Sequence, residues 1–355
     1  MFDTFTFKWL FWRTPKRALH ALPAGVERFF IDTPSGKIEV LFAAAASPSS
    51  KSSSPPLIFV HGGMGGAWVW HEYLQYFSAR GIPCYAVSMR GHGDSWCPSF
   101  LRMVYGTTKS MLADDVVAAI RWAQAREGGE DVVLVAHSSG GGLAQYILSD
   151  RRVRVKGLVL AAAVPGYGSF GVYMNWFRLD PWFSFRMIFH GWHPNSPLSH
   201  PVLVRRVFFS DELADGDVEK FQQKVSPFES FLWPLGMSSP FVRPQTVLQQ
   251  IAGWGSVATK GQRLLILRGE DDKIMDRVQM EKLAAFYRNA FTGLVADKKV
   301  ESEDEDVHAI PGEGGQDSVG HGVRVSVVPK AGHHLQNDVT WEVGARKLLE
   351  FYEQL

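Results

Sequence analysis

Six short runs of apolar residues, each ending in a turn, constrain the fold of this 355-residue chain more than any other feature. Runs that are apolar at every position, rather than at alternate positions, are typical of strands buried on both faces. Helix-like segments separate most of them, and this alternation predicts a parallel α/β sheet with helices on both faces. The runs are LIFVH (57–61), PCYAVS (83–88), VVLVA (132–136), VKGLVLAA (155–162), RLLILR (263–268) and VRVSVV (323–328).

Two further strand-like runs precede these six. VERFFID (26–32) and KIEVLFA (37–43) are joined by TPSG, which predicts a hairpin. We therefore expect a sheet of eight strands, most of them parallel. We expect helices near residues 68–80, 108–126, 140–150, 274–291 and 339–354.

The alternation is interrupted at two places, which suggests how the chain is organised. Residues 165–255 have no buried-strand pattern and are rich in Trp, Phe and Met, so we expect a mostly helical cap inserted after the sixth strand. Residues 293–322 contain ESEDED and PGEGG, which predict a disordered insertion. The α/β core then comprises residues 26–164 and 256–355, and residues 1–25 form an N-terminal arm.

Composition narrows the class of partner. The 37 basic and 36 acidic residues leave a net charge of +1, which argues against nucleic acid as a partner. Two cysteines, Cys84 and Cys97, favour a reducing compartment over a disulfide framework. No apolar run approaches the roughly 20 residues of a membrane span. We expect a cytoplasmic protein, with contact to a membrane surface left open.

The N-terminal arm, MFDTFTFKWLFWRTPKR, places its basic residues after its aromatic ones, the reverse of a secretory signal. One interpretation is peripheral membrane contact, with the aromatic side chains among lipid headgroups. The other is that the arm packs on its own domain or on a second copy of the chain in a homodimer. We favour the packed arm.

The stretch VLVAHSSGGGLAQYIL (133–148) changes from a strand pattern to a helix pattern at Ser138. A serine on so sharp a turn projects its hydroxyl above the sheet, and the residues two positions away must be small. Here they are Ala136 and Gly140. The helix start also directs backbone amides toward any developing oxyanion. A helix cap would explain one serine but not the small residues on both sides, so we interpret Ser138 as a nucleophile.

Other strand ends carry residues that could assist this serine, because ligands of a parallel sheet bind where its strands end. HGGMGGAW (61–68) offers backbone amides to an anion but lacks the G-K-[ST] ending of a phosphate loop. Asp272 and His333 follow the seventh and eighth strands and supply the carboxylate and base that a serine needs. His334 is the alternative base to His333.

These motifs, in this order, resemble the α/β-hydrolase superfamily, and in particular serine esterase-like and lipase-like members with a helical lid, over residues 26–353. HGG (61–63) is similar to that family's oxyanion loop, and AHSSGG (136–141) to its nucleophile elbow. SMRGHGDS (88–95) is similar to the turn after its fourth strand, with Ser88 in place of the usual Asp. GEDD (269–272) and AGH (331–333) resemble its acid and base loops.

The resemblance implies a Ser138–His333–Asp272 triad, with the amides of Gly63 and Ser139 as the oxyanion hole. It implies hydrolysis of a carboxylic ester, lactone or thioester through an acyl-enzyme, without a cofactor. The aromatic cap predicts a small-molecule apolar substrate. We expect that substrate to contact Met64, Trp176 and Trp182.

Other readings of the same residues remain. His190, His193 and His200 match no zinc spacing, so we expect no metal site. HGGMGGAWVW (61–70) is also similar to esterase and hydroxynitrile-lyase relatives, which leaves a lyase, a C–C bond hydrolase or a cofactor-free perhydrolase open. A slow-turnover ligand-binding receptor of the same fold is a further alternative.

Overall fold

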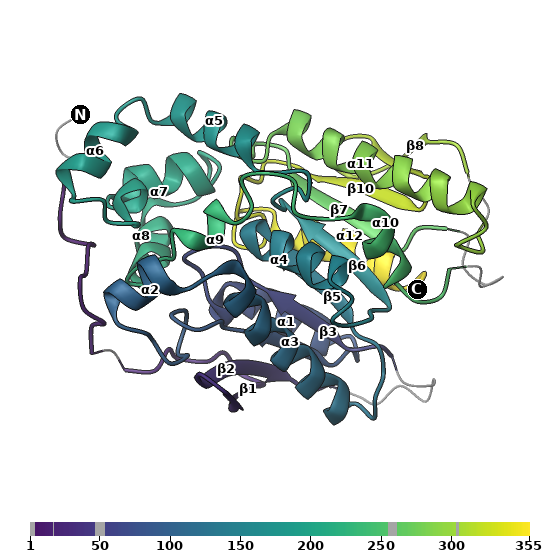
Figure 1. Cartoon of the computed structure of the whole chain (residues 1–355), viewed down its shortest axis with the longest axis horizontal. Coiled ribbons are helices and arrows are strands. Elements are labelled where there is room, and N and C mark those ends of the chain that lie inside the picture. The colour runs from purple at the N-terminus through teal and green to yellow at the C-terminus, as the bar shows by residue number, and fades with distance from the viewer. Residues whose placement is uncertain (1–3, 17, 47–53, 255–260, 303–304) are drawn as a thin grey trace.

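The computed structural model describes residues 4–16, 18–46, 54–254, 261–302 and 305–355. At its centre lies one twisted sheet with the strand order β1-β2-β4-β3-β5-β6-β7-β10-β9-β8 (Figure 1). The strands are β1 (Val26–Thr33), β2 (Gly36–Ala43), β3 (Leu57–Val60), β4 (Cys84–Val87), β5 (Val133–His137), β6 (Gly157–Ala161), β7 (Leu264–Gly269), β8 (His308–Ile310), β9 (Asp317–Gly320) and β10 (Val323–Val328).

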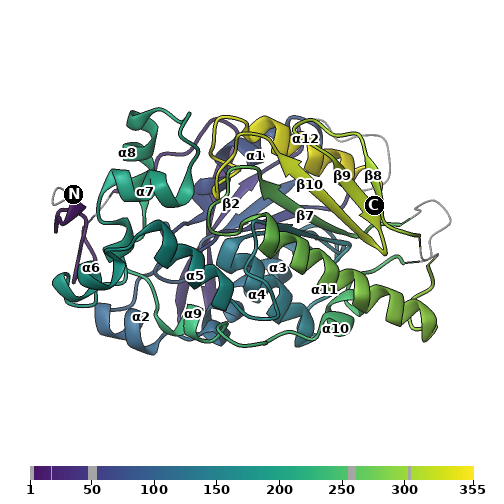
Figure 2. The ribbon, with the colours of Figure 1, turned by 90° about the horizontal axis from the view of Figure 1, so that it is seen from above.

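The six predicted strands from residue 57 onward form the parallel centre of this sheet, from β4 to β10, as predicted. The predicted hairpin is also confirmed, because β1 pairs antiparallel with β2. Helices cover both faces, as Figure 2 shows. One face carries α1 (His71–Ser78) and α12 (Trp341–Tyr352), and the other carries α3 (Lys109–Arg126), α4 (Ser138–Ser149), α10 (Pro244–Gln249) and α11 (Arg277–Ala296).

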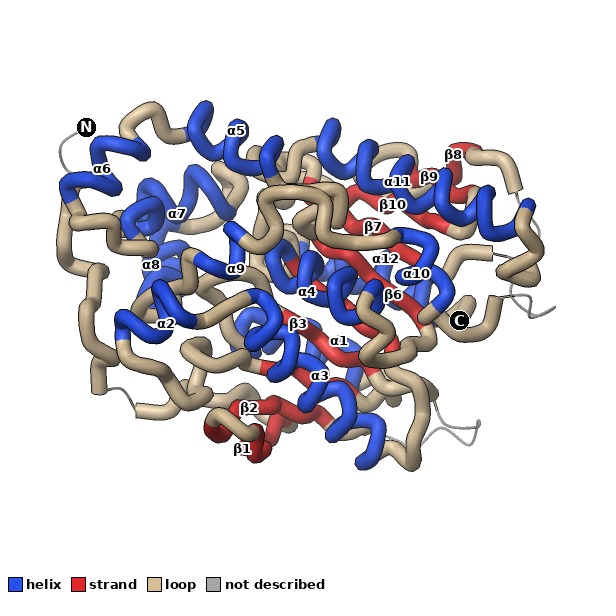
Figure 3. Tube along the Cα trace, in the orientation of Figure 1, coloured by secondary structure: helices blue, strands red, loops and turns tan. Residues whose placement is uncertain are grey.

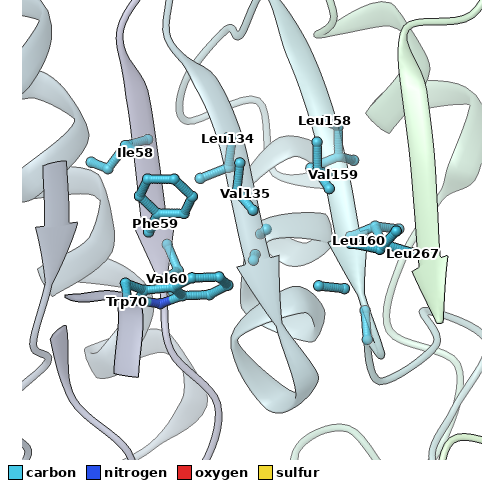
Figure 4. Packing of buried hydrophobic residues seen from close by; sticks show 14 of the residues in the cluster. Ile58, Phe59, Val60, Trp70, Leu134, Val135, Leu158, Val159, Leu160 and Leu267 are labelled. Atoms are coloured by element: carbon cyan, nitrogen blue, oxygen red, sulfur yellow. The ribbon is translucent and has the colours of Figure 1, made fainter. Parts of the chain in front are cut away.

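The core sits between these layers. Side chains of β3, β5 and β6 are completely or almost completely removed from solvent, which explains why these strands are apolar at every position (Figure 4). Phe59 of β3 packs on Trp70, with ring centroids 4.9 Å apart. Trp70 ends the 3₁₀ turn Ala67–Trp70 that follows the glycine-rich loop. The hydrophobic core therefore extends beyond the end of β3 to the buried 3₁₀ turn after the glycine-rich loop.

Two expectations about residues 293–322 are wrong. The sheet has ten strands rather than eight, and the two additional strands, β8 and β9, come from the segment that was expected to be disordered. A buried carboxylate explains the order. Asp317 accepts hydrogen bonds from Lys347 Nζ at 2.8 Å and from Ser326 Oγ at 2.7 Å, and its Oδ2 lies 3.5 Å from Arg324 Nη2.

The insertion after β6 is helical in the part that the structure describes, and it lies over one end of the sheet (Figure 3). Its helices are α5 (Phe170–Leu179), α6 (Phe183–Phe189), α7 (Pro201–Phe208), α8 (Asp215–Lys224) and α9 (Leu232–Leu235), with a 3₁₀ turn at Ser196–Leu198. The short helix α2 (Phe100–Gly106) lies beside α9. Helix α10, although inside residues 165–255, packs on α4 and α11 and thus belongs with the core helices.

The N-terminal arm begins beside α6 in both views (Figures 1 and 2). Leu10 is buried, and His193 Nε2 donates a hydrogen bond to the backbone carbonyl of Phe11 at 2.8 Å. Among the described helices, none combines the length and the hydropathy that a membrane span requires.

The Asp317 cluster generates a stability prediction. Asp317→Ala would leave the buried Lys347 ammonium without its carboxylate, while Arg324 would keep its ion pair with Glu350, so we expect the free energy of unfolding to fall by about 3–5 kcal/mol. Chemical denaturation measures the loss. The control is Glu313→Ala, because Glu313 pairs with Arg346 where both side chains are about half exposed, and such a pair is worth less than about 1 kcal/mol. Equal losses in the two variants would contradict this account of the segment.

Candidate active site

The turn from β5 into α4 is as tight as the sequence predicts. Ser138 has a φ of +53°, a left-handed backbone that non-glycine residues rarely adopt and that is typical of functional sites. A Cβ on Gly140 would lie 2.2 Å from the carbonyl oxygen of His61, and one on Gly141 would lie 2.3 Å from the Cβ of Ala163. Glycines are therefore required here by the close approach of the His61 backbone and of the Ala163 side chain.

Three side chains that are far apart in the sequence meet above this turn. His333 Nε2 lies 2.9 Å from Ser138 Oγ, and His333 Nδ1 lies 2.9 Å from Asp272 Oδ2. Because a carboxylate only accepts hydrogen bonds, Nδ1 carries the proton and Nε2 is left to accept the one from the serine hydroxyl. The structure thus brings the predicted hydroxyl, imidazole and carboxylate into one hydrogen-bonded chain.

Each member of the chain is held by the end of a different strand. Asp272 follows β7, and its second oxygen accepts hydrogen bonds from the amides of Ile274 and Met275 at 2.9 and 2.8 Å. The loop after β10 is fixed from below, because His137 Nε2 donates to the carbonyl of His333 at 2.9 Å. The backbone and the side chain of His333 are therefore both oriented by hydrogen bonds.

The alternative base lies elsewhere. His334 is buried against the rings of Phe208 and Phe221 and near Asn337, so its imidazole belongs to the packing behind the site. Of the two candidate bases, the structure brings His333 to the serine. Asp271, the carboxylate next to Asp272, is exposed.

Burial keeps the surrounding imidazoles neutral. Desolvation lowers the pKa of His61, His137 and His334 well below the ordinary value, and their mutual repulsion adds to this effect. No histidine of this group thus places a fixed positive charge beside His333. His61 braces the glycine loop, with Nδ1 2.7 Å from the carbonyl of Gly62 and Nε2 accepting from the amide of Met89.

The amides of Gly63 and Ser139 belong to residues on the cavity wall beside Ser138. A Cβ on Gly63 would lie 3.9 Å from Ser139 Oγ, so the glycine loop and the first turn of α4 adjoin each other. Amides in the first turn of a helix have no acceptor within the helix, and the helix dipole favours negative charge there. This corner of the site can therefore accept an anionic oxygen.

A mainly apolar cavity of about 200 Å³ opens above the serine. Its walls include Met64 and Trp176, two of the three residues expected to contact a substrate. The third, Trp182, does not line this cavity; its side chain is 40% exposed on the outer side of the cap. Spacing along the insertion did not reveal which side of α6 would face inward. Other apolar walls are Val172, Phe183, Met187, Phe208, Trp233 and Met237.

One polar residue of the cavity wall was not predicted. Glu229, between α8 and α9, accepts hydrogen bonds from the amide of Met64 at 2.7 Å and from His92 Nε2 at 2.8 Å. It therefore ties the insertion to the glycine loop next to the candidate oxyanion corner. Nothing in SPFESF (226–231) marks this glutamate.

Burial lowers the pKa of His92, but the Glu229 carboxylate, the Arg90 carbonyl and Asp115 raise it to a net value above the ordinary 6.5.

The site holds no metal cluster: within the described parts of the chain, no three His, Cys, Asp or Glu side chains are grouped to hold an ion. His190 Nδ1 instead lies 3.0 Å from Ser196 Oγ.

The His92–Glu229 pair predicts a pH dependence of stability. Since the folded-state pKa of His92 lies above its unfolded value, the pair stabilises fully below pH 6.5 and loses this contribution as the pH rises through the raised value. Glu229→Gln should therefore reduce the free energy of unfolding more at about pH 6 than at about pH 9, a range that spans the histidine titration. Glu219→Gln, an exposed glutamate on α8, is the control. A loss that is the same at both pH values would count against the pair.

Comparison with known proteins places this geometry in context. A family model for the alpha/beta hydrolase fold matches residues 55–301. A non-heme chloroperoxidase from Streptomyces lividans is 33% identical over 111 residues, which are 31% of this chain and 37% of that protein. The chain thus matches little more than a third of the length of that curated relative.

Solved structures are similar over most of the chain. A thermophilic esterase from Thermogutta terrifontis superposes with a TM-score of 0.57 at 17% identity, covering 92% of this chain and 98% of the esterase. A carboxylesterase from Bacillus subtilis has a TM-score of 0.53 at 18% identity, covering 93% of this chain and 92% of that enzyme. At such identities the likeness concerns the fold alone.

Proposed function

The chain belongs to the α/β-hydrolase fold family, and from that premise we propose that it is a serine hydrolase acting on the carboxylic ester, lactone or thioester of an apolar small molecule. The observation that carries the proposal is the hydrogen-bonded chain from Ser138 through His333 to Asp272. A buried serine cap would need neither an oriented imidazole nor a carboxylate behind it.

In the first half of the reaction, Ser138 Oγ attacks the carbonyl carbon while its proton passes to His333 Nε2. Asp272 keeps the imidazole in the required tautomer and stabilises the imidazolium that forms. The carbonyl oxygen becomes an oxyanion that accepts from the amides of Gly63 and Ser139, each donor being worth about 3 kcal/mol in the transition state. His333 then protonates the leaving group, and the acyl group remains on Ser138.

In the second half, water attacks the acyl-enzyme. His333 Nε2 takes a proton from the water, a second oxyanion forms in the same corner, and its collapse returns the proton to Ser138 and releases the acid. No step requires a cofactor. Glu229 takes no part in these transfers; its hydrogen bond to the Met64 amide positions the loop that presents Gly63.

The walls of the cavity support an apolar acyl or alcohol group. Aromatic and sulfur-containing side chains surround the serine, and the Glu229 carboxylate is engaged by His92, the Met64 amide and the Ser230 amide. A hydrocarbon chain buried there gains about 0.8 kcal/mol for each methylene removed from water.

A second candidate is a cofactor-free perhydrolase, which the similarity to the Streptomyces chloroperoxidase favours. Hydrogen peroxide would replace water in the second half and attack the same acyl-enzyme. The peroxide oxygen forms the new bond to the acyl carbon, Ser138 leaves with the proton, and a peracid is released. The two reactions are distinguished by incubating one ester with and without peroxide and measuring the oxidation of a dye. A perhydrolase forms a peracid that oxidises the dye, whereas a hydrolase does not.

The nucleophile assignment makes a direct prediction. Ser138→Ala should lower ester turnover by about 10⁴-fold or more and abolish labelling by a fluorophosphonate probe, because no other group can form the acyl-enzyme. The fold should be unchanged by circular dichroism. Asp271→Asn is the matched control, since Asp271 is exposed and adjacent to the proposed acid, and it should keep nearly full activity. Retained turnover in Ser138→Ala would disprove the mechanism. Labelling at Ser138 without ester turnover would instead favour a lyase or a receptor.

The cavity makes a prediction about specificity. With a series of p-nitrophenyl esters, kcat/KM should rise by up to about fourfold for each added acyl methylene until the cavity is filled, as expected for burial worth about 0.8 kcal/mol per methylene. Trp176→Ala should flatten this rise, because it removes one apolar wall. Equal activity on acetate and longer esters would contradict an apolar acyl site.

A further inference from the structure

Helix α6 and the residues at its two ends carry their apolar side chains outward. Helical spacing puts those of α6 and its N-cap on one stripe, the last one follows the helix, and their exposed fractions run from 40% to 63%. The side chains that α6 turns inward include Phe183, Arg186 and Met187. The helix thus exposes large apolar side chains while it buries a charged one. The outward stripe consists of Trp182, Phe185, Ile188, Phe189 and Trp192.

The N-terminal arm enlarges this stripe. Phe7 lies with its ring 5.3 Å from that of Phe189, and Trp12 lies 6.4 Å from Phe7, while both arm residues remain nearly half exposed. The arm is held in place from below, where the guanidinium of Arg186 lies 4.6 Å from the ring of Phe5. We call the five residues of the stripe together with Phe7 and Trp12 the outer apolar face. A contiguous exposed surface of this kind on a folded chain marks an interaction site.

Within the two segments that form the outer apolar face, the exposed charged side chains have one sign, although Lys8 also lines a neighbouring groove with Asp215 and Glu219 of α8. In residues 4–16 and 170–192, all of which the structure describes, the exposed charged side chains are Lys8, Arg13, Lys16 and Arg178. The acidic residue of these segments, Asp180, is buried and lies 3.5 Å from Arg186. The face is therefore a set of large aromatic residues bordered by cations.

The face is continuous with the candidate active site. Tyr173, Trp176 and Phe177 of α5 and Phe183 and Met187 of α6 line the cavity above Ser138. Phe177 also has 45% of its surface exposed, so it belongs to the cavity wall and to the outer surface at once. An apolar molecule on the outer apolar face thus lies against α6, which contributes Phe183 and Met187 to the cavity wall.

We propose that the outer apolar face docks on an anionic lipid surface. Trp and Phe side chains suit the boundary between headgroups and acyl chains, and the surrounding cations suit lipid phosphates and carboxylates. A second copy fits less well, because a two-fold contact through this face would bring the same cations together. Docking itself does not depend on the proposed hydrolysis, but on that function it would present acyl esters of the lipid surface to the cavity.

Sedimentation with vesicles tests the proposal. The full chain is mixed with vesicles of phosphatidylcholine alone or with added phosphatidylserine, in its native form and as Ser138→Ala, so that binding is measured apart from turnover. We expect binding to the phosphatidylserine vesicles in both forms, and a Phe185→Ser/Ile188→Ser variant should bind at least about tenfold more weakly. The affinity of Arg13→Glu/Arg178→Glu for these vesicles should fall about fivefold or more for each reversed charge, and added salt should also weaken the binding of the native chain.

The control is Phe30→Ser, which changes an exposed aromatic residue on β1, away from α6 in Figure 1. It should bind like the native chain, and circular dichroism should show that every variant is folded. Failure of the native chain to bind phosphatidylserine vesicles would overturn the proposal, as would binding that the Phe185/Ile188 variant does not weaken. A dimer in sedimentation velocity that this variant dissociates would assign the face to a second copy and would equally overturn it. Vesicle binding by a native chain that shows no ester turnover would count against the proposed function alone.

Discussion

The left-handed backbone of Ser138 is the constraint on which the other parts of the site depend. A helix that starts so abruptly after β5 has room for its first turn only where Gly140 and Gly141 lack side chains. The same turn brings the serine close to the loop after β3, where a Cβ on Gly62 would lie 2.7 Å from the Cβ of Ser138. The tight turn at Ser138 thus positions both the hydroxyl and the glycine-loop amides. Backbone strain that the surrounding packing maintains is common at functional sites.

The parts of the fold that could be predicted from the sequence are those in which local pattern and burial agree. The central strands are apolar throughout because both faces are covered, and polar residues at their ends stand out against that background. Strand ends of this kind pointed to Asp272, His333 and His334, and the resemblance to the α/β hydrolases selected Asp272 and His333. Their partners in the packing, such as His137 beneath the loop of His333, follow from the same topology once the strands are ordered.

The parts that could not be predicted depend on contacts between distant segments. Residues 293–322 are polar enough to suggest disorder, but Lys347 and Arg324 supply charges that draw Asp317 inward. Glu229 reaches the site only because α8 and α9 place it beside His92. Trp182 was expected in the cavity, yet it lies on the exposed side of α6 with Phe185, while Phe183, Arg186 and Met187 are turned inward.

The hairpin of β8 and β9 has a consequence for how the chain behaves at high concentration. Without it, β10 would be the edge of a parallel sheet, with a row of unpaired backbone amides and carbonyls that other chains could use for strand addition. Strand β9 covers the first half of β10, and the Asp317 carboxylate accepts from the amide of Val327 in the second half. The edge that remains, β8, has only three residues. The hairpin of β8 and β9 thus protects this edge of the sheet from strand addition.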